Sequence, residues 1–177
     1  MNKFIFLIKR PKIVIVLGAA KGLTQTAVLQ VLQSRFKMGQ EVSMVDRDFR
    51  FFIKHSRLAV LAVNGDITQT IPEILLLTQA LPARSYLVLN SDDDAVRDLK
   101  NQTKAHVLTF GFGARADIRA TEVGANFKIS YQGNIVPVWL ENLSDKEQVY
   151  AALSAVAVGE VFGLNLVEVS EALRGLK

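Results

Sequence analysis

The chain has 177 residues, of which 50% are hydrophobic and 21% are charged, and it contains no cysteine. The lack of cysteine excludes a disulfide framework, a thiolate zinc site and a cysteine nucleophile. The two histidines are 51 positions apart, which argues against a histidine-rich metal site. The aliphatic content excludes a disordered chain. The length predicts one domain over residues 1–177 that folds without a metal or disulfide.

The hydrophobic pattern predicts alternating strands and helices up to residue 110. In order, we expect a strand at 13–17, a helix at 24–33, a strand at 58–63, a helix at 70–81, a strand at 86–89, a short helix at 94–100 and a strand at 107–110. The strand segments are short and continuously apolar, which is typical of strands buried on both faces of a parallel sheet. Thr70 and Glu73 have the spacing of a capping box at the start of the second helix.

A β-hairpin is predicted after this alternation. Residues 127–131 and 135–139 are strand-like and flank a Gln-Gly-Asn turn. Because Pro137 has no N–H to donate to a neighbouring strand, we expect the returning strand at an edge of the sheet. Trp139 alternates with Val138, which favours a place in the core over a place in a binding site.

Two helices close the chain. Residues 144–147 have a second capping-box spacing and open a helix that ends at Gly163, and residues 166–173 form a last short helix. Strands that alternate with helices indicate parallel pairing. The predicted fold class is therefore α/β, with a mainly parallel sheet flanked by helices in a P-loop-like three-layer arrangement and a late β-hairpin.

Basic residues are concentrated in the first third of the chain. Residues 1–57 have a net charge of +8, whereas the remaining residues have −4. An ordinary solvated surface is favoured, with nucleic acid, phosphate ligands or an anionic membrane as alternatives. Phe49, Phe51 and Phe52 alternate with basic side chains, a pattern that could clamp single-stranded nucleic acid but that strand or edge packing explains better.

The first residues combine a short apolar run with flanking lysines. The run at 4–8 is shorter than the roughly 7–15 residues of a signal-peptide core, and Pro11 follows it. No segment approaches the ~18 apolar residues of a membrane span. We therefore expect no integral membrane segment and a cytoplasmic location. Contact of Phe4 and Phe6 with a membrane surface is a weaker alternative.

A glycine-containing turn follows the first strand and is the strongest candidate site. The segment Gly-Ala-Ala-Lys-Gly-Leu-Thr, which begins at Gly18, joins a strand to a helix, as phosphate-binding loops do. Such a loop also needs Gly-Lys-Ser/Thr, whereas here Lys21 precedes Gly22 and Leu23 comes before Thr24. Taken alone, the pattern favours an ordinary strand-to-helix turn. If an anion binds there, we expect the basic excess to surround the loop.

The other titratable candidates favour structural roles. Asp92, Asp93 and Asp94 could hold magnesium, but acids at a helix start interact favourably with its dipole, and capping is the preferred interpretation. His55 and His106 have no second ligand nearby in the sequence. We assign no catalytic residue and no metal ligand.

The order of the segments resembles the central domain of the Mur ligases. Among its members, the chain is most similar to the one that adds D-alanyl-D-alanine to a UDP-linked muramoyl tripeptide. The matching landmarks are the strand and loop at 10–18, Gly-Asp-Ile at 65–67, Val-Leu-Asn-Ser-Asp-Asp at 88–93, the segments 109–111 and 116–120, and the helix at 149–158.

The resemblance implies ATP and magnesium as cofactors. The positions that correspond to the family's nucleotide-contacting residues are Gly18, Lys21, Gly22, Thr24, Asn90 and Gln148. It also implies an N-terminal UDP-substrate domain and a C-terminal ligase domain, neither of which we expect in this chain.

Several family positions carry other residues, which argues against catalysis. Lys21 and Gly22 are reversed relative to the family loop, and Leu23 stands where its magnesium-binding hydroxyl belongs. Ala62 replaces a metal-ligand glutamate, and Ile74 stands near the expected modified lysine. In the last helix, Glu147 replaces a histidine, and Gln148 and Ala151 replace asparagines.

The expected function is that of a degenerate, non-catalytic Mur-ligase-like domain of the nucleotide-binding type in a peptidoglycan setting. The first alternative is an ATP-dependent amide ligase that partner chains complete, and the second is a basic module for nucleic acid or another anion. A nucleotide, a protein partner or a second copy of the chain is the expected partner, and nucleic acid is disfavoured. The family would imply an acid–amino-acid ligase, but the changed positions leave enzymatic activity open.

Overall fold

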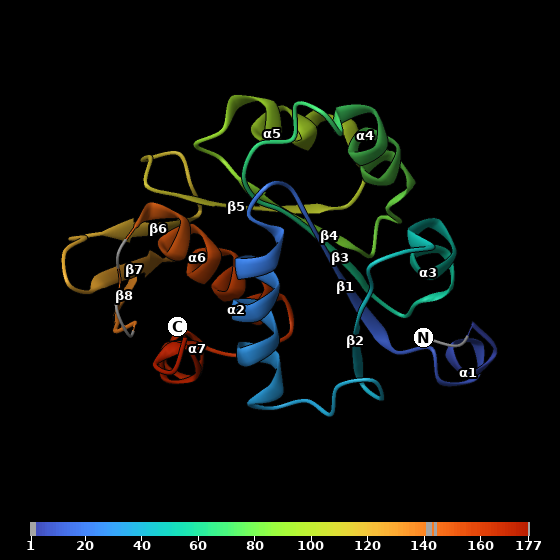
Figure 1. The fold of residues 1–177 in the computed structure, drawn as a ribbon, viewed down its shortest axis with the longest axis horizontal. Coiled ribbons are helices and arrows are strands. Elements are labelled where there is room, and N and C mark those ends of the chain that lie inside the picture. Colours follow the sequence, from blue (N-terminus) through green and yellow to red (C-terminus); the bar gives the residue numbers. More distant parts are fainter. Residues whose placement is uncertain (1–2, 141–142, 144, 177) are drawn as a thin grey trace.

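The computed structural model describes residues 3–140, 143 and 145–176. Within them the strands form one eight-stranded sheet in the order β2-β1-β3-β4-β5-β6-β7-β8 (Figure 1). The strands are β1 (Lys12–Leu17), β2 (Val42–Met44), β3 (Ala59–Val63), β4 (Tyr86–Asn90), β5 (His106–Gly111), β6 (Ile118–Thr121), β7 (Phe127–Tyr131) and β8 (Asn134–Val138). The pairs from β2 to β6 are parallel, and β7 and β8 pair antiparallel at one end.

Helices cover both faces of this sheet. One face packs on α2 (Lys21–Gln33), α6 (Lys146–Val161) and α7 (Leu166–Leu173). The other packs on α1 (Lys3–Lys9), α3 (Phe49–His55), α4 (Ile71–Ala80), α5 (Asp94–Asp98) and the 3-10 turn Leu99–Gln102. The fold is therefore α/β in three layers with a late hairpin, as the sequence predicts.

The continuous apolar strands have a direct structural reason. In β1, Val14 and Val16 pack in the core with α2 and α6, whereas Ile13 and Ile15 pack in the opposite core with α3 and α4. All four side chains are fully buried. Because successive side chains of a strand point to opposite faces, a strand covered on both faces needs an unbroken apolar run.

Helix α6 lies between the sheet, α2 and α7 and is buried along most of its length. A side chain added at Gly159 would come within 2.8 Å of a Val169 methyl and 3.2 Å of a Val31 methyl. Gly159 therefore allows α6 to approach both neighbouring helices closely, and a larger residue would overpack this core.

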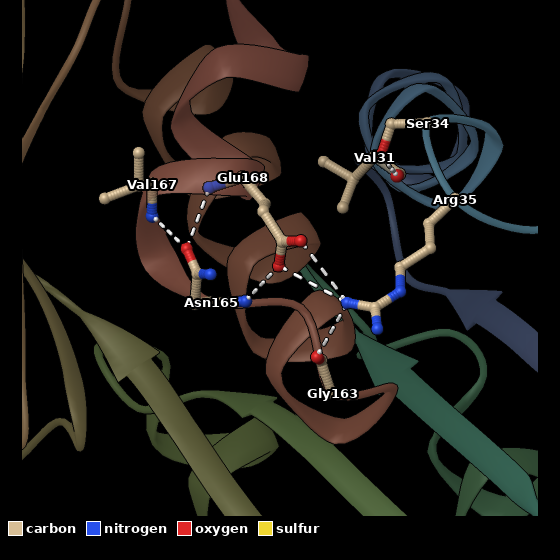
Figure 2. Close-up of polar contacts among 7 residues, drawn as sticks. All are labelled: Val31, Ser34, Arg35, Gly163, Asn165, Val167 and Glu168. Atoms are coloured by element: carbon tan, nitrogen blue, oxygen red, sulfur yellow. Dashed lines mark hydrogen bonds and ion pairs between the residues drawn. The ribbon is translucent and has the colours of Figure 1, made fainter.

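Polar contacts fix the corner where α2, α6 and α7 meet (Figure 2). The Arg35 guanidinium donates to the carbonyl oxygen of Gly163 and to Glu168, both at 3.3 Å. Glu168 also accepts from the N–H of Asn165 at 2.8 Å, while the Asn165 side chain accepts from the N–H groups of Val167 and Glu168. This capping box starts α7 and was not predicted from the sequence.

One of the two predicted capping boxes is absent, and the other lies partly outside the described residues. Thr70 makes no capping bond to α4, and its hydroxyl donates instead to the carbonyl oxygen of Ile67 at 3.3 Å. The prediction of a capping box at Thr70 is therefore wrong. Ser144 lies outside the described residues, and the N-cap of α6 is Asp145, whose carboxylate accepts from the N–H of Gln148 at 2.9 Å.

The core prediction for Trp139 is also wrong. Its side chain is 44% exposed, and the Arg174 guanidinium lies 5.3 Å from the ring centroid. Pro137, by contrast, lies in β8 at the end of the sheet order, which confirms its edge position. Residues 47–54, expected as strand or edge packing, form the loop before α3 and most of that helix.

Candidate functional site

The loop after β1 is pressed against the end of β3. Gly18 has φ +104°, and a Cβ atom there would overlap the carbonyl oxygen of Asn64. Gly65 has φ +83°, and its Cβ would lie 2.9 Å from the backbone nitrogen of Ala20. Only glycine meets both the backbone angle and the close approach at Gly18. The two strand ends are therefore in direct backbone contact.

Backbone donors of this loop bond to carbonyl groups of the protein. The N–H of Ala19 donates to the Asp66 carbonyl at 3.1 Å, and that of Lys21 donates to the Gly18 carbonyl at 3.1 Å. The N–H of Thr24 donates to Ala20 at 3.0 Å, as in a regular helix. In a phosphate-binding loop such N–H groups point at the anion. At Ala19 and Lys21 they are already used.

A chain of buried hydrogen bonds runs beneath the loop. The Asn64 side chain donates to the Thr24 hydroxyl at 2.9 Å and accepts from the Asn90 side chain at 3.1 Å. The Asn90 oxygen accepts from the N–H of Asp92 at 3.0 Å. Thr24, Asn64 and Asn90 are 0%, 1% and 4% exposed. Polar side chains buried this deeply need such partners, so the chain ties the ends of α2, β3 and β4 together.

On the α6 side of the loop lies a cavity of about 350 Å³. Its lining includes four carboxylates, those of Asp66, Asp92, Asp93 and Glu147, together with the phenol of Tyr150. No lysine or arginine among the described residues lines it. The cavity is therefore electrostatically unfavourable for an unaccompanied polyanion.

Asp92 connects three elements at this cavity. Its carboxylate accepts from the N–H of Phe112 at 2.6 Å, from the N–H of Gly113 at 3.1 Å and from the Tyr150 hydroxyl at 3.1 Å. Burial, followed by the negative charge of Asp92, raises the pKa of Tyr150 to about 12. Tyr150 is therefore protonated at neutral pH and donates to Asp92.

On the α4 side lies a second cavity of 440 Å³, which Lys21 lines together with Asp66, Thr68 and Glu73. The Asp66 carboxylate accepts from the N–H of Thr68 at 2.8 Å, and this hydrogen bond lowers the pKa of Asp66. Lys21 therefore lines the cavity on the α4 side, which contains Asp66 and Glu73, and not the carboxylate-lined cavity on the α6 side.

The structure brings together most of the candidates from the sequence. Gly18 and Lys21 belong to the loop and line the 440 Å³ cavity, whereas Thr24 and Asn90 are buried beneath the loop. Gly22 is exposed in the first turn of α2, and the half-buried Gln148 lies in the first turn of α6. Asn64 begins one of the segments that follow predicted strands, but its hydrogen bond to Thr24 and the Asp92–Tyr150 pair were not predicted, because neither contact has a local sequence signal.

The acids and histidines have structural partners. Asp93 caps α5 by accepting from the N–H of Val96, and Asp94 pairs with Arg97 at 2.7 Å. His55 Nδ1 lies 2.8 Å from the Phe51 carbonyl oxygen, and the His106 ring lies 5.0 Å from that of Tyr86. No group of three or more potential metal ligands occurs among the described residues.

The basic excess does not surround the loop. Lys9, Arg10, Lys12 and Arg57 line a pocket beside the first residue of β1, whereas the loop follows its last residue, Leu17. The strand is six residues long, so about 17 Å separates its first and last residues. The expectation that these cations serve the loop is therefore wrong. They form a separate surface.

Comparisons with known proteins bear on this geometry. No family model matches the chain. It is 34% identical over 102 residues to the UDP-N-acetylmuramate–L-alanine ligase of Xylella fastidiosa, covering 54% of this chain and 21% of that protein. It is 33% identical over 95 residues to the UDP-N-acetylmuramoyl-L-alanyl-D-glutamate–2,6-diaminopimelate ligase of Halalkalibacterium halodurans, covering 51% and 19%. The chain thus matches about a fifth of the length of these relatives.

Solved structures match nearly the whole chain. The murein peptide ligase Mpl of Neisseria meningitides aligns with a TM-score of 0.77 at 16% identity, over 99% of this chain and 68% of that one. The MurF ligase of Thermotoga maritima in complex with ADP aligns with a TM-score of 0.72 at 13% identity, over 95% and 50%. At these identities the match establishes the fold.

Helices on both faces of one mainly parallel sheet define a three-layer α/β domain. With its sequence similarity to these ligases and its fold, the chain is a Mur-ligase-like domain. Which member it resembles most is not decided by these matches, because they include ligases for L-alanine, diaminopimelate and whole peptides.

Proposed function

We propose that this domain is a non-catalytic relative of the Mur ligase central domain and acts in the cytoplasm in a peptidoglycan setting. The observation that carries the proposal is that the loop after β1 is closed to an anion: backbone N–H groups in it are bonded within the protein. The N–H groups of Ala19 and Lys21 donate to the protein's own carbonyls, which leaves two fewer donors for a phosphate.

The charges around the loop support the same conclusion. Transfer of a phosphoryl group needs cations that stabilise its charge, and removing one such group commonly costs about 10²–10³ in rate. Four carboxylates line the cavity beside the loop, and Ala62 stands in β3 where the family has a metal-ligand glutamate. Thr24, the substitute for the magnesium-binding hydroxyl, is fully buried and bonded to Asn64. Ala62, the buried Thr24 hydroxyl and the occupied N–H groups of the loop do not fit ATP with magnesium.

Titration calorimetry with ATP and magnesium tests the loop. We expect no binding at millimolar nucleotide in the wild type, and an ADP-release assay with peptidoglycan precursors should detect no turnover. Heat that disappears in Lys21→Ala but persists in the matched surface variant Lys37→Ala would contradict the closed-loop proposal and assign a residual nucleotide site to Lys21.

The alternative is an ATP-dependent ligase that partner chains complete. It is favoured by the 440 Å³ cavity beside Lys21, which is large enough to admit part of a ligand. Co-purification followed by the ADP-release assay separates the two functions. Turnover that appears only with a co-purified partner, and that Lys21→Ala abolishes, would establish the ligase and overturn our proposal.

A further inference from the structure

Helix α1 exposes an apolar stripe at the amino end of the sheet. Phe4, Ile5, Leu7 and Ile8 are 71%, 48%, 38% and 69% exposed, whereas Phe6 is 1% exposed. At 3.6 residues per turn, Phe4 and Ile8 lie nearly opposite Phe6, and Ile5 and Leu7 lie on the two flanks of the helix between them. Soluble surfaces seldom gather four large apolar side chains on two helical turns without a binding role.

The rest of the domain holds this stripe outward. The Phe6 ring packs edge-on against Phe52 with centroids 4.7 Å apart and lies 6.3 Å from Phe51. The Lys3 ammonium pairs with Asp48 at 2.8 Å and lies 5.2 Å from the centroid of the Phe51 ring. Because these contacts join α1 to α3, the orientation of the stripe is set by packing, not by the short helix alone.

Cations lie directly beside the stripe. Lys9, Arg10 and Arg57 line a pocket of 240 Å³ at the end of α1, whereas the ammonium of Lys12, which also lines it, lies over the rings of Phe36 and Phe162. The acid in this pocket, Glu41, accepts the backbone N–H of Lys37 at 2.8 Å. The exposed side chains of Arg50 and Lys54 add positive charge along α3.

We propose that this surface binds an anionic lipid bilayer, with the α1 stripe at the boundary between headgroups and acyl chains and the neighbouring cations at the lipid phosphates. An apolar helix side flanked by lysines and arginines has the composition of interfacial helices. A bilayer offers both an apolar layer and fixed negative charge, whereas a nucleic acid offers no aliphatic layer for Ile5, Leu7 and Ile8. No described helix could cross the membrane, so the contact is peripheral.

This orientation leaves the carboxyl end of the sheet facing water. The pocket of cations adjoins Lys12, the first residue of β1, and the loop at Gly18 follows the last. Binding through α1 therefore places the two cavities beside the loop on the side away from the lipid, and it does not depend on the function proposed for that loop.

Co-sedimentation of the full chain with vesicles tests the proposal. We expect binding to vesicles that contain phosphatidylglycerol, little binding to phosphatidylcholine alone, and release by salt as the Debye length shortens. Ile5→Ser/Ile8→Ser should abolish the bound fraction. Lys9→Gln/Arg57→Gln should weaken the affinity by about fivefold for each charge removed. The matched control is Ile135→Ser. Ile135 is 63% exposed on β8, at the opposite end of the sheet order from β2 and β1.

Circular dichroism establishes that each variant is folded before its result is used. Equal loss of binding in Ile135→Ser would overturn the assignment of the surface. Binding that survives Ile5→Ser/Ile8→Ser, or that a short oligonucleotide or inorganic phosphate competes away completely, would show a general anion site and refute the bilayer. No binding of the folded wild type to anionic vesicles would also refute it.

Discussion

The two ends of the parallel sheet are built in opposite ways. At the carboxyl end, Gly18, Asn64 and Asp92 take part in close packing and internal hydrogen bonds beside a cavity lined by carboxylates. At the amino end, Lys9, Arg10 and Arg57 line a pocket beside the exposed apolar side chains of α1. The end expected to bind a ligand is therefore the one held by internal hydrogen bonds, whereas the opposite end exposes cations and apolar side chains to solvent.

The largest effect should come from closing the space at Gly18. Gly18→Ala adds a Cβ that overlaps the Asn64 carbonyl at a backbone angle unfavourable for alanine, and we expect a loss of about 3 kcal/mol in unfolding free energy. Urea denaturation measures it. The control is Gly22→Ala, which meets no atom within 4 Å in the first turn of α2 and should raise stability by up to about 1 kcal/mol. Equal effects at both glycines would contradict the close packing at the carboxyl end.

A smaller effect is expected beneath the loop. Thr24→Val keeps the shape of the side chain but leaves the buried Asn64 amide without its acceptor, which should cost about 2 kcal/mol. Thr26→Val on the exposed side of the same helix is the control and should change stability by less than about 0.5 kcal/mol. Thermal denaturation compares the two. If both variants are neutral, the hydrogen-bonded chain does not stabilise this end.

Tyr150 links stability to pH. Its pKa is raised to about 12 in the folded state from 10.0, so the stabilisation is complete below pH 10 and is lost as pH rises from 10 toward 12. Tyr150→Phe should cost about 1 kcal/mol at neutral pH by removing the bond to Asp92. Denaturation midpoints of both proteins between pH 8 and about 11 should converge as the pH rises. A constant difference would exclude this linkage.

The smallest effect should appear at the amino end. Lys9→Gln/Arg57→Gln removes two exposed charges from a region of net positive charge, and the free energy of unfolding should stay within about 0.5 kcal/mol or rise slightly. Differential scanning calorimetry at low and high salt provides the comparison. A loss comparable to that of Thr24→Val would mean that this end also stabilises the fold and would remove the contrast between the two ends.

The strands paired in the middle of the sheet were predictable because their apolar runs are local signals. β2 and β6 have three and four residues, and they become strands by pairing with β1 and β5. α1 and α3 were missed because Phe6 and Phe52 bury each other only after folding. Their sequences contain no indication of that contact.

The candidate loop was predictable from its glycines, but its surroundings were not. Asn64 meets Thr24 and Asn90 because β3 pairs with both β1 and β4, with Val63 opposite Leu17 and Leu89. That register follows from the assembled sheet. The position of the basic residues at the opposite end depends in the same way on where β1 begins, and net charge alone could not locate them.

The packing of α6 against α2 also has a consequence for biosynthesis. The Val31 side chain of α2 packs over Gly159 of α6, although more than a hundred residues separate the two in the sequence. During translation, the part of the sheet that α6 covers stays exposed until α6 has left the ribosome. Contacts this distant slow folding, and the uncovered face is prone to aggregation in the meantime. A nascent chain stalled before residue 146 should therefore engage chaperones, and a nascent chain long enough to expose α6 should not.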